Sequence, residues 1–170
     1  RGLETDQKLG STIVAPFPYR LAMRGILTLF LGLLLLPAAA LGQAPAYFAQ
    51  WGGYGTTNGN FRDPYDVAVV PGFIYVVDSF NHRVQKLDSN GFFVLKWGSQ
   101  GTANGQFQQD LSVAVDPSGN VYVSDNSNHR IQKFTSGGVF LLKWGTQGTA
   151  AGQFQFPRGL AVDAASNVYV

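Results

Sequence analysis

The sequence predicts an all-β chain that is built from repeated units of four short antiparallel strands. The main observation is a period of 46 or 47 residues, which one tyrosine and one tryptophan mark in every unit. These anchors are Tyr75, Tyr122 and Tyr169 (122−75 and 169−122) together with Trp51, Trp97 and Trp144 (97−51 and 144−97). Residues 78–86 nearly repeat as residues 125–133, and residues 101–107 nearly repeat as residues 148–154. Self-similarity at a fixed period of this length indicates a repeat architecture.

The second unit has the pattern of four strands separated by turns. The four predicted strands are residues 113–115, 120–124, 130–134 and 139–144, and in residues 120–124 β-branched and aromatic residues alternate as a half-buried strand requires. Turn-favouring Asp, Asn, Ser, Gly and Pro separate them, in residues 116–119, 125–129 and 135–138. A long Gly-containing loop, residues 145–156, leads to the next first strand at residues 160–162. Units of four antiparallel strands and about 40 to 50 residues are typical of the blades of a β-propeller.

Five short motifs recur together at fixed spacing within residues 47–170. They are W-G-x-x-G, Q-F, V-A-V-D, V-Y-V-x-D and N-H-R-[IV]-Q-K. This combination resembles the NHL repeat family, and the resemblance implies a propeller of six blades in the complete protein. The copies differ in two places, with Val70 against Asp116 and Asp163, and with Asp110 against Pro64 and Pro157. Neither difference disturbs the strand pattern.

The first 42 residues predict two segments that precede the repeats. Residues 1–22 come before the only methionine, Met23, and are expected to be upstream or non-structural sequence. Residues 23–42 combine a charged start, an apolar segment and small residues before Gly42, which is the pattern of a secretory signal peptide. An uncleaved membrane anchor is the alternative, although the apolar run is shorter than the roughly 20 residues of a spanning helix. We therefore expect residues 43–170 to be secreted, or to lie in the periplasm or cell envelope, without membrane attachment after cleavage.

The expected mature segment carries no net charge. Residues 1–42 hold four basic and two acidic residues, which account for the whole formal net charge of +2. Eight basic and eight acidic residues (12−4 and 10−2) remain in residues 43–170. This balance argues against nucleic acid as a partner, because its binding needs clustered Lys and Arg. The chain has no cysteine, which excludes disulfides, zinc fingers and thiol catalysis.

The sequence given stops inside the third unit. Val170 falls in the second expected strand of that unit, so about two and a half blades are present, whereas closed propellers have about 4 to 8. Residues 47–51 align with residues 93–97, and we expect them to be a fourth strand that completes the last blade of the ring. A fragment truncated in this way would expose unpaired strand edges, so we expect it to self-associate.

One face of the predicted propeller collects the long loops. Consecutive strands run in opposite directions, which places residues 52–63, 98–109 and 145–156 beside the turns between second and third strands. Long loops on a rigid scaffold are where binding residues usually lie, so this long-loop face is expected to bind the ligand. Its candidate residues are His82, His129, Asp66, Asn104 and Arg158. The opposite, short-turn face has only tight turns and is expected to form no pocket.

The repeated turn residues have a predicted structural role. They are Asp78, Asn81, Arg83, Asp125, Asn128 and Arg130. We expect them to bond their own turn and its neighbour, because Asp and Asn satisfy turn backbone and Arg pairs with carboxylates. The equivalent His82 and His129 could instead suggest a metal or catalytic centre, but repetition alone accounts for their equivalence. No catalytic residue and no metal ligand is predicted, and the tryptophans are expected to pack between blades.

The resemblance implies two functional classes. In one, an NHL propeller is a non-catalytic platform that binds a protein, a peptide, a glycan or, in some cytoplasmic relatives, RNA. In the other, similar six-bladed rings are lyases or lactonases with a divalent metal ion in the central channel. We predict the first class, an exported binding propeller without a cofactor, with the metal-dependent enzyme as the alternative. A repeat-breaking carboxylate or histidine at the start of the inner strand would favour the enzyme, and Asp66 is the one candidate ligand there.

Overall fold

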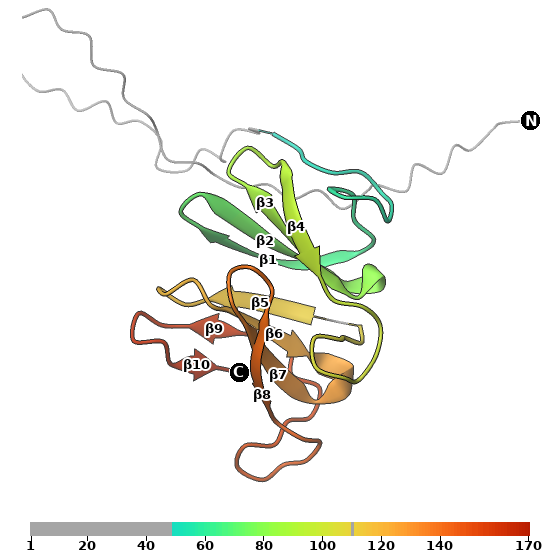
Figure 1. Ribbon diagram of the computed structural model, residues 1–170. Coiled ribbons are helices and arrows are strands. Elements are labelled where there is room, and N and C mark those ends of the chain that lie inside the picture. Colours follow the sequence, from blue (N-terminus) through green and yellow to red (C-terminus); the bar gives the residue numbers. More distant parts are fainter. Residues whose placement is uncertain (1–48, 110) are drawn as a thin grey trace, which may run out of the picture. The chain divides into compact units, whose positions relative to one another are not determined.

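Two four-stranded antiparallel sheets dominate the part of the chain that the structure describes. The computed structural model describes residues 49–109 and 111–170 (Figure 1). The first sheet consists of β1 (Pro64–Val70), β2 (Phe73–Asp78), β3 (Arg83–Asp88) and β4 (Phe93–Trp97). The second consists of β5 (Leu111–Val115), β6 (Val121–Asp125), β7 (Arg130–Phe134) and β8 (Phe140–Trp144), and it is followed by the pair β9 (Ala161–Val162) and β10 (Val168–Tyr169). In each sheet, strands adjacent in sequence pair antiparallel, which confirms an all-β chain of four-stranded blades.

The two blades share one strand register. Tyr75 of β2 lies opposite Lys86 of β3, and Tyr122 of β6 lies opposite Lys133 of β7. In both blades the pairing of the third strand with the fourth shifts at the same place, directly after that lysine. The first strands differ, because β1 has an irregularity near its start whereas β5 pairs residue by residue. Matching residues of the repeat therefore occupy matching positions, except where β1 begins.

The segment between the second and third strands is a short 3-10 helix in each blade. These helices are η1 (Ser79–Asn81) and η2 (Asn126–Asn128). Each ends at a histidine in the left-handed region, with φ of 52° at His82 and 54° at His129. Histidine is among the residues enriched at positive φ, so the backbone turn already gives a reason for its place in the repeat.

Several sequence predictions fall at or beyond the edge of the described residues. The upstream segment, residues 1–22, and the signal peptide, residues 23–42, lie outside them. The fourth strand expected at residues 47–51 is absent from its described part, because no strand is assigned to residues 49–51. Within residues 49–109 and 111–170, no helix is long and apolar enough to span a bilayer.

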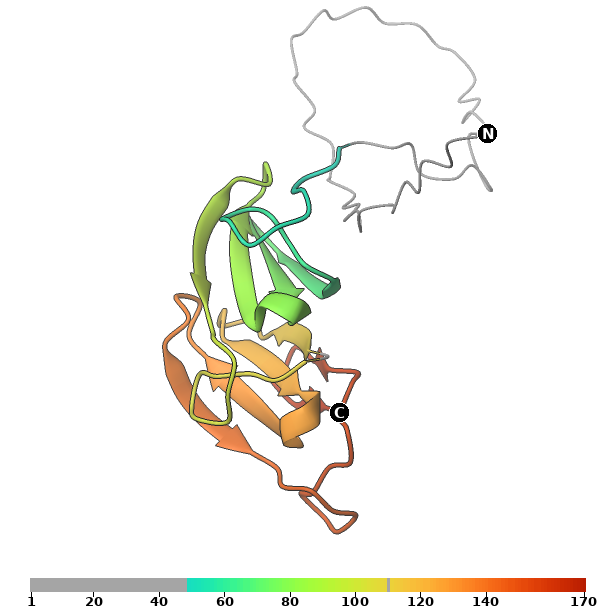
Figure 2. The ribbon, with the colours of Figure 1, turned by 90° about the vertical axis from the view of Figure 1, so that its right-hand side faces the viewer.

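The hydrophobic core lies between the two blades. Strands β1 and β5 run side by side, as both views show (Figures 1 and 2). The buried members of the core come from both sheets and from the loop that joins them: Tyr75, Val77, Val84, Phe107, Leu111, Val113, Val121, Val123 and Phe134. Full burial of such a side chain contributes about 1.5–3 kcal/mol, so each blade depends on its neighbour to cover an apolar face.

Tryptophan packing joins one blade to the next. The ring of Trp97, at the end of β4, lies 6.2 Å from that of Tyr75 in its own blade and 5.8 Å from that of Phe134 in the following blade. Gly138, in the turn before β8, lies against the same ring, because a Cβ there would come within 2.8 Å of Trp97. The predicted packing of a tryptophan between blades is confirmed for Trp97.

Candidate functional site

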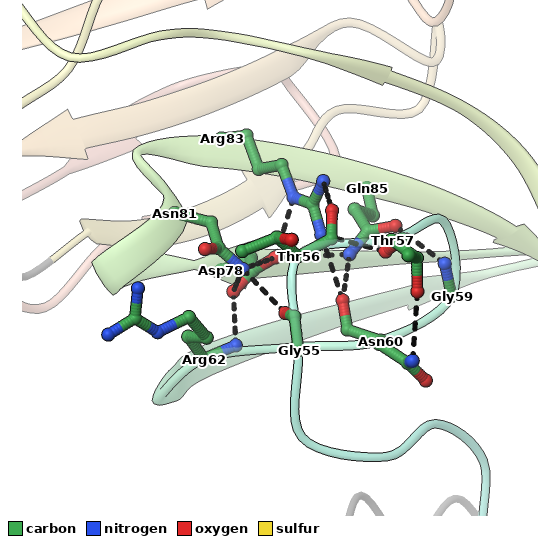
Figure 3. A network of polar contacts seen from close by, with 10 residues as sticks. All are labelled: Gly55, Thr56, Thr57, Gly59, Asn60, Arg62, Asp78, Asn81, Arg83 and Gln85. Atoms are coloured by element: carbon green, nitrogen blue, oxygen red, sulfur yellow. Dashed lines mark hydrogen bonds and ion pairs between the residues drawn. The ribbon is translucent and has the colours of Figure 1, made fainter.

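Asp78 organises the long loop that precedes its own blade. Its side chain is fully buried at the end of β2, and Arg83 at the start of β3 pairs with it, with 2.6 Å between Nε and Oδ2. The other oxygen accepts a hydrogen bond of 2.7 Å from the backbone N–H of Arg62 in the loop. Asn81 of η1 donates to both carboxylate oxygens and also to the carbonyl of Gly55 (Figure 3). The carboxylate therefore connects a strand, a 3-10 helix and a loop.

Arg83 and Gln85 extend these contacts along the loop. The guanidinium donates to three loop carbonyls, those of Thr56 (2.8 Å), Thr57 (3.1 Å) and Asn60 (2.9 Å). The amide of Gln85 donates to the carbonyl of Asn60 and accepts from the N–H of Gly59, at 2.7 and 2.9 Å. Asp78, Asn81, Arg83 and Gln85 are called the clamp of the first blade below.

The second blade has the same clamp. Its members are Asp125, Asn128, Arg130 and Gln132. Arg130 pairs with Asp125 at 2.9 Å and donates to the carbonyls of Thr102, Ala103 and Gln106. Gln132 takes the place of Gln85, with bonds to the carbonyl of Gln106 and the N–H of Gly105. Each repeat thus uses a buried ion pair and two amides to fix the shape of its own loop.

Aromatic side chains support the loops from beneath. Phe61 and Phe107, one in each loop, are buried, as expected for residues that fill the space under a loop. The N–H of Phe107 donates to the carbonyl of Ser99 (2.9 Å), and its own carbonyl accepts from Gly101. Gly98, with φ of +108°, lies so close to the Phe107 ring that a Cβ would come within 2.7 Å of it. The glycine is required there by both its backbone conformation and the ring.

Two of the five predicted ligand-binding residues, Asp66 and His129, make side-chain hydrogen bonds, and a third, His82, is part-buried. Asp66 accepts hydrogen bonds from the N–H of Val67 (2.8 Å) and of Val113 in β5 (3.0 Å), so it links the first strands of the two blades. His129 Nδ1 accepts from the N–H of Phe156 at 3.2 Å, and the two rings pack edge to face. His82 is part-buried beside the long loop, and its Nδ1 has no hydrogen-bond partner among the described residues.

The remaining two candidates stand in solvent on loops. Asn104 is exposed at the tip of the loop between β4 and β5. Arg158 is also exposed, and its backbone carbonyl accepts a bond of 3.4 Å from Ser124 Oγ. Within the described residues, no hydrogen bond or ion pair joins any two of the five candidates, and no group of three or more His, Asp or Glu could hold a metal ion. No contact therefore links the five residues to one another, and their role in ligand binding stays a prediction.

Sequence reasoning missed the two glutamines of the clamps. Gln85 and Gln132 are both fully buried, and each bonds the loop through donor and acceptor. A signal was available, because both belong to the repeated N-H-R-[IV]-Q-K motif and alternate in register with Arg83 and Arg130. Side chains two apart on a strand point to the same side, so an arginine that contacts the loop predicts that the glutamine does so too.

Asp116 organises the turn between β5 and β6. It accepts from the backbone N–H of Asn120 (2.8 Å), from the Asn120 side chain (2.8 Å) and from the Tyr122 hydroxyl (3.1 Å), with Lys133 Nζ at 3.7 Å. Burial acts to raise the pKa of Asp116, but the bonds from Asn120 and Tyr122 and the charge of Lys133 prevail and lower it. The Tyr122 hydroxyl and then the Asp116 charge raise the pKa of Lys133. Asp163 accepts the corresponding bonds in the third unit.

The short-turn face contains a cavity, although the sequence predicted no pocket there. A cavity of about 540 Å³ opens there, between the turns of successive units. It is lined by Val70 and Pro71 of the first unit, by residues 115–119 of the second and by residues 162–164 of the third. Each turn is as short as predicted. The expectation was wrong because it considered single turns, whereas the cavity is formed by neighbouring turns together.

In the comparisons with known proteins, one segment of the chain matches a family model. The family model described as NHL repeat matches residues 111–134, which extend from the start of β5 to the end of β7. A search of curated protein sequences gives no match.

Solved structures with a similar arrangement are distant in sequence. One is a Bacteroides fragilis protein described as exported, with 18% identity, 55% of this chain and 27% of that chain covered, and a TM-score of 0.45. A second is Kuenenia stuttgartiensis hydrazine synthase, with 14% identity, 67% of this chain and 31% of that chain covered, and a TM-score of 0.49. A third is Staphylococcus aureus virginiamycin B lyase, with 13% identity, 62% of this chain and 33% of that chain covered, and a TM-score of 0.46. The chain spans at most 33% of the length of these proteins, and likeness at this level says nothing about activity. The family match and the repeated motifs together identify residues 111–134 as an NHL repeat, in a chain built of propeller-type blades.

Proposed function

We propose that the chain belongs to an exported NHL-repeat propeller that acts as a non-catalytic platform and binds a protein, peptide or glycan on its long-loop face. The observation that carries the proposal is the separation of roles within each long loop. The charged side chains of the clamp are buried and bond the loop from inside, whereas uncharged hydrogen-bonding residues stand exposed at its tip. Such loops have a fixed shape and a surface ready for contact.

The exposed tips suit a neutral polar ligand. Thr57 and Asn58 stand at the tip of the first loop, and Thr102 and Asn104 at the tip of the second, all exposed. Hydroxyl and amide groups both donate and accept hydrogen bonds, which matches peptide backbone and sugar hydroxyls. Because the tips repeat from blade to blade, an elongated ligand would meet similar groups in succession, and linked weak contacts add up to useful affinity.

The metal-dependent lyase or lactonase stays an alternative proposal. It would require a ligand that breaks the repeat at the inner strand, and Asp66 is the candidate. Two backbone N–H groups already use the Asp66 carboxylate, which favours a role in joining blades. A turnover that appears only with added divalent metal ions and disappears in Asp66→Asn would favour the enzyme.

Printed glycan and peptide arrays probed with the fluorescently labelled chain test the platform. We expect at least one glycan or peptide class to bind, and the double variant Asn58→Ala/Asn104→Ala to weaken it by about tenfold or more. Asn90→Ala is the matched control, because Asn90 is an exposed asparagine in the β3–β4 turn of the opposite face and should leave binding unchanged. Absence of binding on both arrays, or equal loss in the control, would contradict the proposal.

Export is the second part of the proposal and has its own test. N-terminal sequencing of the product that leaves the cell should give a chain that starts close to residue 43. A mature chain that still contains residues 31–36 would favour the membrane anchor instead.

A further inference from the structure

The cavity on the short-turn face has the size of a small-molecule site. Its volume of about 540 Å³ falls inside the range of roughly 300–1,000 Å³ that is usual for ligand pockets. Apolar side chains form much of its wall, including Pro71, Phe73 and Pro117. Polar groups from the first unit also line it, namely those of Tyr75 and Lys86. This combination of an apolar wall and a few polar groups is typical of ligand pockets.

In the second blade, the equivalent tyrosine and lysine contact a carboxylate of the chain. Tyr122 and Lys133 are the counterparts of Tyr75 and Lys86, and both contact the carboxylate of Asp116. The hydroxyl donates to Oδ2 at 3.1 Å, and the ammonium lies 3.7 Å from the same oxygen. In this blade, the pair is a carboxylate-binding arrangement whose carboxylate belongs to the chain itself.

The first blade has kept the pair and lost the carboxylate. Val70 stands where Asp116 stands in the second blade, and Phe73 stands where Asn120 stands. Lys86 is only 7% exposed, and its ammonium donates to the carbonyl of Ser136 (3.2 Å) and lies 3.7 Å from the centre of the Phe73 ring. A carbonyl and an aromatic face do not neutralise the charge, and lysines are rarely this buried without an anionic partner.

We propose that this cavity binds a small amphiphilic carboxylate, whose carboxylate group takes the place of the aspartate that the first blade lacks. The ligand carboxylate contacts Lys86 and Tyr75, in the way that Asp116 contacts Lys133 and Tyr122 in the next blade. An aromatic or aliphatic tail lies along Pro71, Phe73 and Pro117. This site is on the opposite face from the long loops, so it does not depend on the platform proposed above.

Other charges around the cavity are compatible with an anionic ligand. Asp116 also lines it, but Lys133 and hydrogen bonds from Asn120 and Tyr122 already compensate that carboxylate. Asp163, from the third unit, is half-buried, so water and salt partly screen its charge. Among the charged lining residues, Lys86 and Asp163 have no oppositely charged partner within the described part of the chain, and of these two Lys86 is the buried one.

Hydrocinnamate and its neutral amide form a matched pair of probes for this site. NMR titration of the isotope-labelled chain should move the backbone signals of Phe73 and Lys86 with the acid, and the acid should bind at least about tenfold more tightly than the amide. Equal affinity of acid and amide would show that charge is not recognised, and the proposal would be wrong. It would be equally wrong if neither probe perturbed these signals.

Two variants locate the site. Lys86→Met keeps the apolar stem and removes the charge, and it should weaken acid binding by about tenfold or more. Val70→Asp restores the missing carboxylate inside the chain, and it should block acid binding while raising the temperature of unfolding. Asn90→Ala, outside the cavity lining, should bind the acid as the wild type does. Unchanged acid binding in a folded Lys86→Met or Val70→Asp chain would overturn the proposal.

Discussion

At the scale of single residues, buried carboxylates decide much of the structure. Asp78 and Asp125 are completely buried, and each accepts bonds from an arginine, an asparagine, a glutamine and a loop N–H. A buried ion pair contributes little net stability by comparison with an apolar pair, but it is costly to break. These residues therefore fix the conformation more than they add to the free energy of folding.

Replacing Asp125 with Ala should strongly destabilise the chain. Arg130, which is 5% exposed, would lose its carboxylate partner, and breaking a buried ion pair costs about 3–5 kcal/mol. Urea unfolding followed by tryptophan fluorescence should show the loss, whereas Ser127→Ala at an exposed position of the same segment should have little effect. A variant that unfolds like the wild type but no longer binds its ligand would contradict the structural role.

The lowered pKa of Asp116 makes part of the stability depend on pH. A carboxyl group whose pKa is lower in the folded than in the unfolded chain adds stability above its unfolded pKa, near the ordinary value of 3.8. That contribution is lost as the pH falls through the lower, folded value. The free-energy difference between wild type and Asp116→Asn should therefore be largest at neutral pH and shrink below about pH 4. A difference that stays constant down to acid pH would exclude this linkage.

At the scale of elements, the sequence predicts strands better than loops. Alternation of residues 120–124 identifies β6 to within one residue, because burial of one strand face depends on local spacing. The shape of the loop between β4 and β5 depends on Arg130, which contacts carbonyls 24 to 28 residues earlier in the chain. The short-turn cavity is likewise a product of neighbouring units. Contacts over such distances leave no local pattern, so neither feature follows from one segment.

Exchanging Arg130 for Lys should loosen one loop and leave the strands in place. A lysine cannot reach Asp125 and three carbonyls together, because it lacks the planar fork of the guanidinium. Hydrogen exchange at the amides of Gly101 and Phe107, both bonded within the loop, should become faster, while exchange in β6 changes little. Arg158→Lys, at an exposed position, is the control. Equal protection of the loop in both variants would show that the clamp is dispensable.

At the scale of the whole molecule, the two blades are joined by apolar packing and by a hydrogen bond between their first strands. The core and the Trp97 ring are shared by both blades, and Asp66 adds a hydrogen bond between their first strands. The period of the sequence predicts this stacking, since repeat units bury their apolar faces against neighbours. It does not predict how far one blade rotates from the next, and six blades in the complete protein stays a prediction.

Two glycine substitutions separate backbone strain from blade packing. Gly138 and Gly72 have nearly the same φ, +81° and +83°, but only Gly138 would place a new Cβ against Trp97. Both changes to Ala should cost about 1–2 kcal/mol of strain, and Gly138→Ala should cost about 1–3 kcal/mol more through the clash. Thermal unfolding of the two variants measures the difference. Equal melting temperatures would mean that the contact between tryptophan and glycine does not couple the blades.

The contact between tryptophan and glycine joins a tryptophan to the blade that follows it in the sequence. Trp97 packs on Gly138 of the blade that follows it, and Trp51 packs in the same way on Gly91. Each blade therefore receives an indole ring from the segment before it through a glycine turn of the same kind. An additional copy of the unit would meet a compatible partner on both sides, so a gene for such a chain can lengthen by duplication without the need for a new interface.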